Sequence, residues 1–260
     1  MKKLVLGMVG LVALGTASAS AADLPARTYT KAPAMIAAVY DWTGFYVGLN
    51  GGGGFSHNCW TNSAAVVAGV LVATAPTVSE GCHDASGGMV GGQVGYRWQS
   101  ANWVFGVEGQ GDWANFKGSN VSAAGLAAPL TGITNQTKVD AIGLLTGQVG
   151  YAWNNVLWYV KGGAGVTHDR YHGYVAGTGL LLDSSDQTRW GGAVGTGVEV
   201  GFAPNWSVGV EYDHVFMGTH TMTFTTPAGG VTRTDSVKQD VDLASVRVNY
   251  RWGGPVVAKY

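Results

Sequence analysis

The sequence lacks long apolar runs and carries little charge. Its longest apolar run, from Leu4 to Leu14, is interrupted by glycine and is shorter than the roughly 20 residues that a membrane-spanning helix needs. No later segment supplies such a run, so we do not expect a helical membrane protein. Only 12% of the 260 residues are charged, against roughly 25% in an ordinary soluble domain. A typical soluble globule is therefore not expected either.

The first 21 residues have the three parts of a secretory signal. Lys2 and Lys3 precede the apolar run, and the small residues Ala19 to Ala21 follow it. We predict a signal peptide over 1–21, cleaved before Ala22. The remaining chain would hold 13 basic and 16 acidic residues, a net charge of about −3. This balance is too near neutral for a nucleic-acid-binding surface, so no nucleic-acid partner is expected.

Cysteine is also scarce, since Cys59 and Cys82 are the only two. Their spacing matches no zinc-binding pattern. In an exported protein, two cysteines that flank one predicted loop favour a disulfide.

Glycine is abundant, and apolar residues alternate with small or polar ones along much of the chain. The chain has 42 glycines, which suit tightly curved sheet walls. Between Arg189 and Arg251, every second residue is apolar or aromatic, and the residues between them include Gly, Ser, Glu, Asn and Arg. This is the period of a β-strand. Because the charges lie at matching distances from the turns, we place them on an enclosed face, and the apolar face then points toward lipid.

Eight segments have this alternation: 42–55, 87–99, 103–116, 138–153, 156–171, 189–203, 206–216 and 239–252. Short turns at 100–102, 154–155 and 204–205 alternate with long loops at 57–86, 117–137, 172–188 and 217–238. An even number of antiparallel strands with alternating short turns and long loops is typical of an outer-membrane barrel. We therefore predict an all-β fold, an eight-stranded antiparallel transmembrane up-and-down β-barrel over 41–252. A flexible periplasmic tail at 22–40 would precede it, and a C-terminal extension at 253–260 would follow.

Some details of this prediction stay open. A ten-stranded barrel would result if the first long loop folded back as a spanning hairpin. Ile142 and Leu144 blur the alternation of their strand. Val241 and Leu243 have the wrong parity for the last strand, which points to a bulge near Ala244.

Charged residues of inward parity are expected to form a belt inside the barrel. Each main member lies about five residues from its nearest turn or strand end, and an eight-stranded barrel is just filled by its own side chains, so these charges should meet and pair. The belt comprises Glu108, Lys161, Glu199, Glu211 and Arg247, with Arg97, Asp112, Asp140, Asp213 and Arg251 as partners in a second layer. A polar core that fixes barrel register and a narrow ion path are its two interpretations.

Aromatic residues gather near the short turns. Rings that share one depth on different strands are typical of a lipid-interface girdle. Its tryptophans are Trp98, Trp103, Trp153, Trp158, Trp206 and Trp252. Trp60, Phe116, Tyr171, Trp190 and Phe216 would supply an opposite girdle.

No catalytic, metal or cofactor site is predicted. The six histidines fall at predicted outer strand ends or loops without a defined ligand spacing: His57, His83, His168, His172, His214 and His220. Haem or metal capture by these residues is kept as an alternative. His214 has outward parity near the outer rim, but no serine can be assigned to it as the partner that a lipid-modifying enzyme would need.

Three segments carry a family resemblance. Ala22-Asp-Leu-Pro-Ala-Arg, Trp42-Thr-Gly-Phe-Tyr-Val-Gly-Leu-Asn and Val246-Arg-Val-Asn-Tyr-Arg-Trp resemble the small alphaproteobacterial outer-membrane proteins of the opacity-like, porin-like surface antigen family. The resemblance implies an eight-stranded barrel in the envelope, and some relatives are associated with haemin binding. It also implies that insertion machinery recognises an aromatic-ended last strand, which either Trp252 or Tyr260 would complete.

The expected function is that of a non-enzymatic outer-membrane barrel that supports envelope integrity and presents surface loops. A narrow pore and a haem- or metal-binding surface protein are the alternatives. The expected partners are outer-membrane lipid and lipopolysaccharide, the barrel-assembly machinery during insertion, and other surface or envelope proteins.

Overall fold

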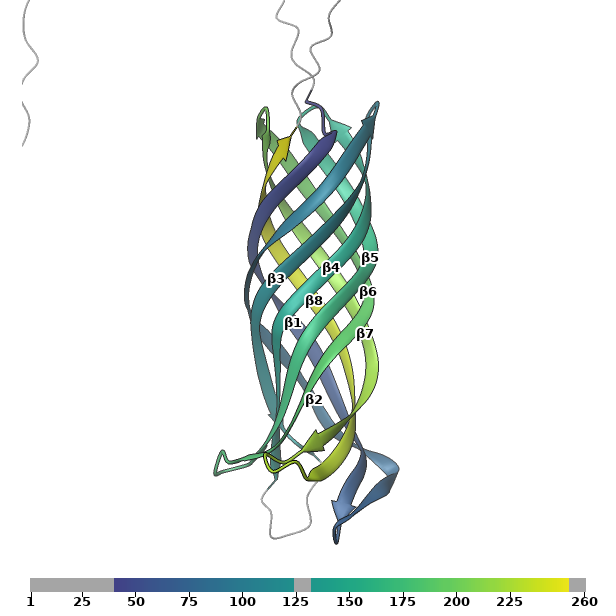
Figure 1. Cartoon of the computed structure of the whole chain (residues 1–260), viewed down its shortest axis with the longest axis vertical. Coiled ribbons are helices and arrows are strands. Elements are labelled where there is room, and N and C mark those ends of the chain that lie inside the picture. Colours follow the sequence, from purple (N-terminus) through teal and green to yellow (C-terminus); the bar gives the residue numbers. More distant parts are fainter. Residues whose placement is uncertain (1–39, 124–131, 253–260) are drawn as a thin grey trace, which may run out of the picture. The chain divides into compact units, whose positions relative to one another are not determined.

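Eight antiparallel strands form a closed barrel (Figure 1). The computed structural model describes residues 40–123 and 132–252. The strands are β1 (Gly44–Val67), β2 (Val70–Ser100), β3 (Trp103–Val121), β4 (Ile133–Trp153), β5 (Val156–Val175), β6 (Leu181–Ala203), β7 (Trp206–Thr225) and β8 (Val231–Trp252). Each strand pairs with its sequence neighbour, and β1 pairs with β8 to close the ring. The predicted fold class is confirmed. The signal predicted for 1–21 and the extension predicted for 253–260 lie outside the described residues, as does the tail predicted for 22–40 except Tyr40. The Tyr40 ring packs against Trp42, with ring centroids 4.7 Å apart.

The three short turns join the strands at one end of the barrel, the turn end. They occupy residues 101–102, 154–155 and 204–205, as the sequence predicted to within one residue. Ala101 and Asn154 adopt left-handed backbone with φ of 52° and 57°. Trp42 lies just before β1 and is buried at this end, where its indole nitrogen donates to the Asn154 carbonyl at 3.3 Å.

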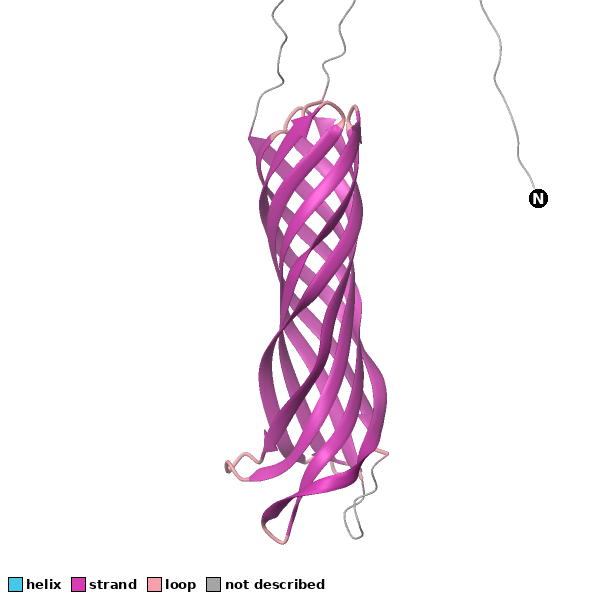
Figure 2. Cartoon of the chain, turned by 90° about the vertical axis from the view of Figure 1, so that its right-hand side faces the viewer, coloured by secondary structure: helices cyan, strands magenta, loops and turns pink. Residues whose placement is uncertain are grey.

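At the opposite end, the hairpin end, the long predicted loops are largely strand. β1 and β2 continue to Val67 and Val70, so residues 57–86 lengthen two existing strands and add no ninth and tenth spanning strand. The described connections here are short, at 68–69, 176–180 and 226–230. Figure 2 shows the strands running nearly the full height of the barrel. The sequence pattern missed these extensions because alternation fades beyond the lipid, where the outward face of a strand need not be apolar.

Two irregularities differ from the predictions. The register between β4 and β5 shifts between Val139 and Ala141, so Val139, Ile142 and Leu144 all face the interior. Asp140 therefore lies on the outer surface, where it contacts Lys138 and Arg170, and it is not a partner of the belt. The bulge predicted near Ala244 is absent, since β8 keeps its register with both neighbours there.

The interior contains three apolar layers. The turn-end layer is Trp42, Val104, Ala152, Leu157 and Tyr159. The middle layer is Ala85, Met89, Phe116, Val139, Ile142, Leu144, Ala193, Val215, Met217, Val241 and Leu243. The outer layer is Trp60, Tyr171, Met222, Phe224 and Val237. Val241 and Leu243 thus share their parity with the charged residues of β8, because the lumen alternates apolar and polar layers.

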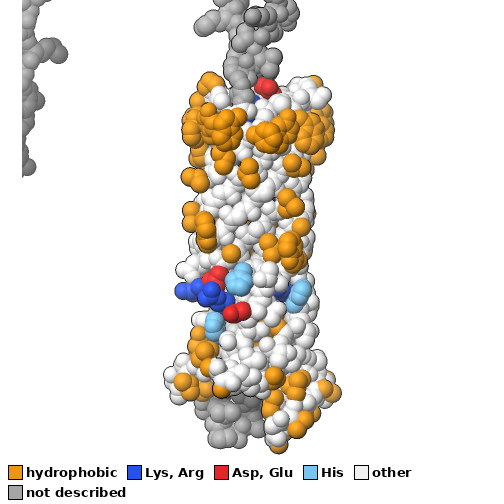
Figure 3. All heavy atoms as spheres, in the orientation of Figure 1, with side chains coloured by type: hydrophobic (Ala, Val, Ile, Leu, Met, Phe, Trp, Pro, Cys, Tyr) orange, Lys and Arg blue, Asp and Glu red, His pale blue; other side chains and the backbone are white. Residues whose placement is uncertain are grey.

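The outer surface has a band of exposed apolar side chains (Figure 3). At the turn end the six predicted girdle tryptophans all point outward, with exposed fractions between 44% and 55%. Neighbouring rings contact one another, as in Trp103 with Tyr151 at 5.5 Å and Trp206 with Tyr250 at 5.1 Å. This arrangement suits a lipid interface.

The opposite girdle was only partly predicted. Trp190 and Phe216 point outward, and Trp113 and Phe55 join them. Trp60, Phe116 and Tyr171 are instead fully buried inside the barrel, in the outer and middle layers. Beyond the apolar band, charged and histidine side chains appear on the surface (Figure 3).

Candidate functional site

Of the ten residues predicted for the belt and its second layer, seven form one buried network, which we call the charge belt. Its members are Arg97, Glu108, Lys161, Glu199, Glu211, Asp213 and Arg247. All are at most 6% exposed.

Arg247 is the centre of this network. Its two terminal nitrogens contact the carboxylates of Glu108 and Glu211, which come from β3 and β7. The Arg247 side chain is 1% exposed. One guanidinium therefore compensates two buried carboxylates.

Lys161 lies beside Arg247 and shares its partners. The Lys161 ammonium lies 2.7 Å from Glu211, 3.1 Å from Asp213 and 3.6 Å from Glu108. Three cations and four carboxylates thus meet at this level of the barrel, and each of these seven charges has an opposite partner.

The third cation spans the barrel. Arg97 on β2 contacts Glu199 on β6 at 2.9 Å, and these strands are on opposite sides of an eight-membered ring. Glu199 also accepts hydrogen bonds from Ser207 and from Asn249, the latter at 3.0 Å. The pair therefore crosses the lumen.

Two tyrosines that the sequence analysis did not single out complete the belt. The Tyr46 hydroxyl donates to Glu108 at 2.6 Å and the Tyr159 hydroxyl donates to Glu211 at 2.5 Å. Glycines make room for both rings, because a Cβ at Gly95 or Gly197 would lie 2.5 Å from the corresponding phenol oxygen. The sequence did contain a signal for this arrangement, because both tyrosines have inward parity and are paired with glycines on neighbouring strands.

Besides Asp140, two further predicted members lie outside the charge belt. Arg251 is buried at the turn end, where it donates to the carbonyls of Thr43 and Pro204 at 2.9 and 3.1 Å. Asp112 is buried next to the belt, but its described hydrogen bond comes from Gln110 at 2.9 Å and no described cation pairs with it. Strand parity placed both side chains inside the barrel, but it could not identify their partners.

A second buried charge group, the outer cluster, lies at the hairpin end and was missed. Arg233 contacts Glu80 at 3.0 Å, Asp235 at 3.1 Å and Asp183 at 3.2 Å. Burial, opposed by Arg233 and reinforced by the Glu80 charge, raises the pKa of Asp235 to about 7. These residues belong to segments that the sequence pattern assigned to loops.

A cavity of about 510 Å³ adjoins the outer cluster. Arg233, Glu80 and Asp183 line it together with apolar and small side chains of β1, β2, β4, β6 and β8. Those side chains are Ala65, Val66, Val78, Ile133, Leu182 and Val231, among others. We call this space the outer cavity.

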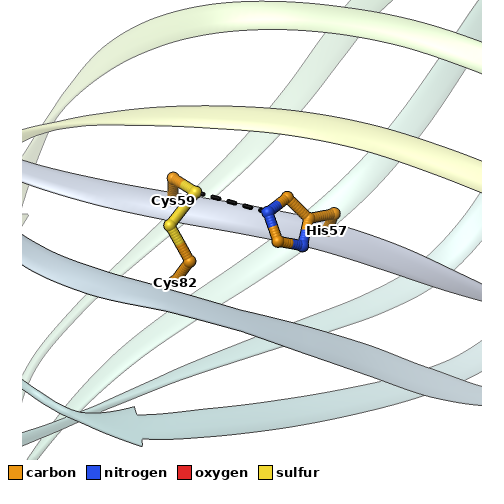
Figure 4. A group of neighbouring side chains, drawn as sticks. All are labelled: His57, Cys59 and Cys82. Atoms are coloured by element: carbon orange, nitrogen blue, oxygen red, sulfur yellow. Dashed lines mark hydrogen bonds between the residues drawn. A yellow bond between two sulfur atoms is a disulfide. The ribbon is translucent and has the colours of Figure 1, made fainter.

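Cys59 and Cys82 form a disulfide, as predicted. They are cross-strand neighbours on β1 and β2 and not loop residues. His57 approaches Cys59 Sγ at 3.4 Å (Figure 4). These three are the one group of possible metal ligands close together in the described ranges, 40–123 and 132–252. The two sulfurs are bonded to each other, so neither is available as a thiolate ligand for a metal.

The histidines lie on strands and are not gathered. The His83 ring faces the interior and contacts Asn120 and Thr137. His214 points outward and contacts Asp242 at 2.7 Å. Among the residues that the structure describes, no serine forms a hydrogen bond with His214.

Known proteins are similar to this chain along most of its length. Residues 9–252 match the family described as outer membrane protein beta-barrel domain. The 31 kDa outer-membrane immunogenic protein of Brucella melitensis is 30% identical over 230 residues, which cover 84% of this chain and 88% of that protein. The protein of the same description from Brucella suis matches equally. The solved structure of the outer membrane protein OprG from Pseudomonas aeruginosa is 15% identical, with a TM-score of 0.48, over 80% of this chain and 97% of that chain.

Proposed function

Because the chain belongs to the outer membrane protein beta-barrel domain family and is an integral outer-membrane protein, we propose that it is a closed, non-enzymatic barrel that supports the envelope. In this proposal the hairpin end faces the cell exterior and presents the strand extensions as a surface antigen. The similarity to outer-membrane immunogenic proteins supports the second part.

The layered interior is the observation that carries the proposal. Along β8 the inward side chains include Arg247 in the charge belt, Leu243 and Val241 in the middle layer, Val237 in the outer layer and Arg233 in the outer cluster, with the polar Gln239 and Ser245 between them. A permeating ion would have to pass both a crosslinked belt and apolar layers, where its desolvation is costly.

Planar-bilayer recording tests closure against the narrow-pore alternative. We expect purified, refolded protein to give no stable unitary current steps, because the buried side chains of the charge belt and the middle layer occupy the lumen. A parallel gel-mobility assay of folded and unfolded forms checks that the protein has inserted. Stable steps that vanish in Glu108→Gln or Lys161→Met would replace closure with an ion path through the charge belt.

We also propose contact with lipopolysaccharide phosphate on the outer surface. Lys117, Lys138 and Arg170 are direct cross-strand neighbours on β3, β4 and β5. Like charges placed opposite each other destabilise a sheet. Asp140 contacts Lys138 and Arg170, and Asp186 lies opposite Arg170, but Ser86 is the residue opposite Lys117 on β2. A lipid phosphate would supply the missing negative charge.

Lipid binding by variants tests this contact. The substitution Lys117→Gln combined with Lys138→Gln should weaken binding to phosphorylated lipid A at least about tenfold, because a charge-assisted hydrogen bond contributes roughly 1.5–3 kcal/mol. Native mass spectrometry of detergent-purified protein gives the bound fraction. Lys238→Gln, an exposed lysine on β8, is the matched control. Equal loss for dephosphorylated lipid A, or in the control, would contradict phosphate recognition.

Haem or metal capture remains the third function to test. The six histidines lie on separate parts of the surface and interior, and within the described part of the chain the one close group of possible ligands is the disulfide with His57. Titration of haemin against the refolded protein and a variant without its six histidines would separate histidine ligation from adsorption.

A further inference from the structure

The outer cavity has a charged floor and apolar walls. Leu182, Val66 and Val231 belong to the walls, and Glu80, Asp183 and Arg233 form the floor. A volume of about 510 Å³ lies within the range of small-molecule sites. An apolar wall of this kind favours a ligand body made of hydrocarbon.

The net charge of the floor determines whether a cationic or an anionic ligand is attracted. Among the described residues, Arg233 is the only cation that lines the cavity, and it contacts the floor carboxylates of Glu80 and Asp183. It also contacts Asp235, which belongs to the outer cluster but not to the cavity lining. All four residues are at most 4% exposed. The floor therefore carries an excess of buried negative charge, which attracts a cation and repels an anion.

Glu80 is the carboxylate that connects the outer cluster to the outer cavity. Asn135 and Arg233 both donate to Glu80 Oε2, at 2.6 and 3.0 Å. The residue is 3% exposed and lines the cavity. A cation in the cavity can therefore approach a carboxylate that is already held in place by two donors.

The floor becomes more negative as the pH rises. Burial raises the pKa of Asp235 to about 7, with the Glu80 and Asp183 charges acting in the same direction and Arg233 against them. Asn62 also donates to this carboxylate, at 2.9 Å. Asp235 is therefore mostly protonated at pH 5.5 and mostly ionised at pH 8.

We propose that the outer cavity binds a small amphipathic cation, with its ammonium group at Glu80 and its hydrocarbon body against Val66, Leu182 and Val231. This inference goes beyond the proposed structural role and does not depend on whether the barrel conducts. The apolar walls disfavour a hydrated inorganic ion, and the negative charge of the floor disfavours a fatty acid.

Methyl NMR of the full-length protein in lipid nanodiscs tests the proposal with hexylammonium as probe. Ile133 lines the cavity, whereas Ile142 lies in the middle layer. We expect a saturable shift of the Ile133 methyl signal and none at Ile142. Hexanol and hexanoate should bind at least tenfold more weakly, and hexylammonium affinity should rise severalfold from pH 5.5 to pH 8.

Two variants separate the charge from the shape of the site. Glu80→Gln should weaken hexylammonium at least tenfold, and Leu182→Phe should reduce binding of every probe by filling the cavity. Asp186→Asn removes an exposed carboxylate of β6 outside the cavity lining and should leave binding unchanged. A single sharp Ile133 signal in the unliganded variants shows that the hairpin end has folded. Equal affinity for hexanol, tighter binding of hexanoate, or no saturable shift at Ile133 would overturn the proposal.

Discussion

Replacing Arg247 with alanine is expected to lower the free energy of unfolding by about 3–5 kcal/mol, because it leaves buried carboxylates without their main counterion. Glu108 and Glu211 each contact this guanidinium, and all three side chains are at most 4% exposed. Lys161 remains nearby but already serves Glu211 and Asp213. Urea unfolding in phospholipid vesicles, followed by tryptophan fluorescence, measures the loss.

Two further variants test whether the loss of stability comes from uncompensated buried charge. Arg170→Ala removes an arginine whose side chain is 47% exposed and paired with Asp140, so it should cost less than about 1 kcal/mol. The triple variant Arg247→Met with Glu108→Gln and Glu211→Gln should recover more than half of the loss, because it removes the uncompensated charges as well. If Arg247→Ala cost no more than Arg170→Ala, the charge belt would not be a stabilising core.

Truncating Phe116 to alanine is the second large effect that we expect, again about 3–5 kcal/mol in the free energy of unfolding. The ring is fully buried in the middle layer and fills space beside Gly54, where an added Cβ would lie 3.0 Å from the ring. Removing the ring would leave a cavity in the middle layer, and its close-packed neighbours cannot easily move to fill that cavity. The same unfolding assay measures the change.

The control for Phe116 is Phe216→Ala. Phe216 points outward and is 51% exposed, so its truncation leaves no internal cavity and should cost clearly less. Bilayer recording of Phe116→Ala combined with Leu243→Ala gives an independent readout, because thinning the middle layer should produce intermittent currents that the parent barrel lacks. Equal destabilisation by Phe116→Ala and Phe216→Ala would mean that the interior is loosely packed at this level.

Strand alternation was most informative inside the apolar band. There it predicted the three short turns, the outward tryptophans of the turn end and the inward placement of Glu108, Lys161 and Arg247, because lipid on one side and a polar lumen on the other impose a period of two. The same rule failed at the hairpin end. Trp60 and Tyr171 were assigned to an outer girdle, yet both are fully buried in the outer layer.

The sequence by itself determined the barrel, its orientation of faces and its disulfide, since these follow from local alternation, turn spacing and two cysteines. Only the tertiary structure decided which charges pair and where the barrel closes. Arg97 meets Glu199 from the far side of the ring, and Arg233 collects carboxylates from β2, β6 and β8. Partners of this kind are set by strand register and side-chain packing across the lumen, which the period of a single strand does not encode.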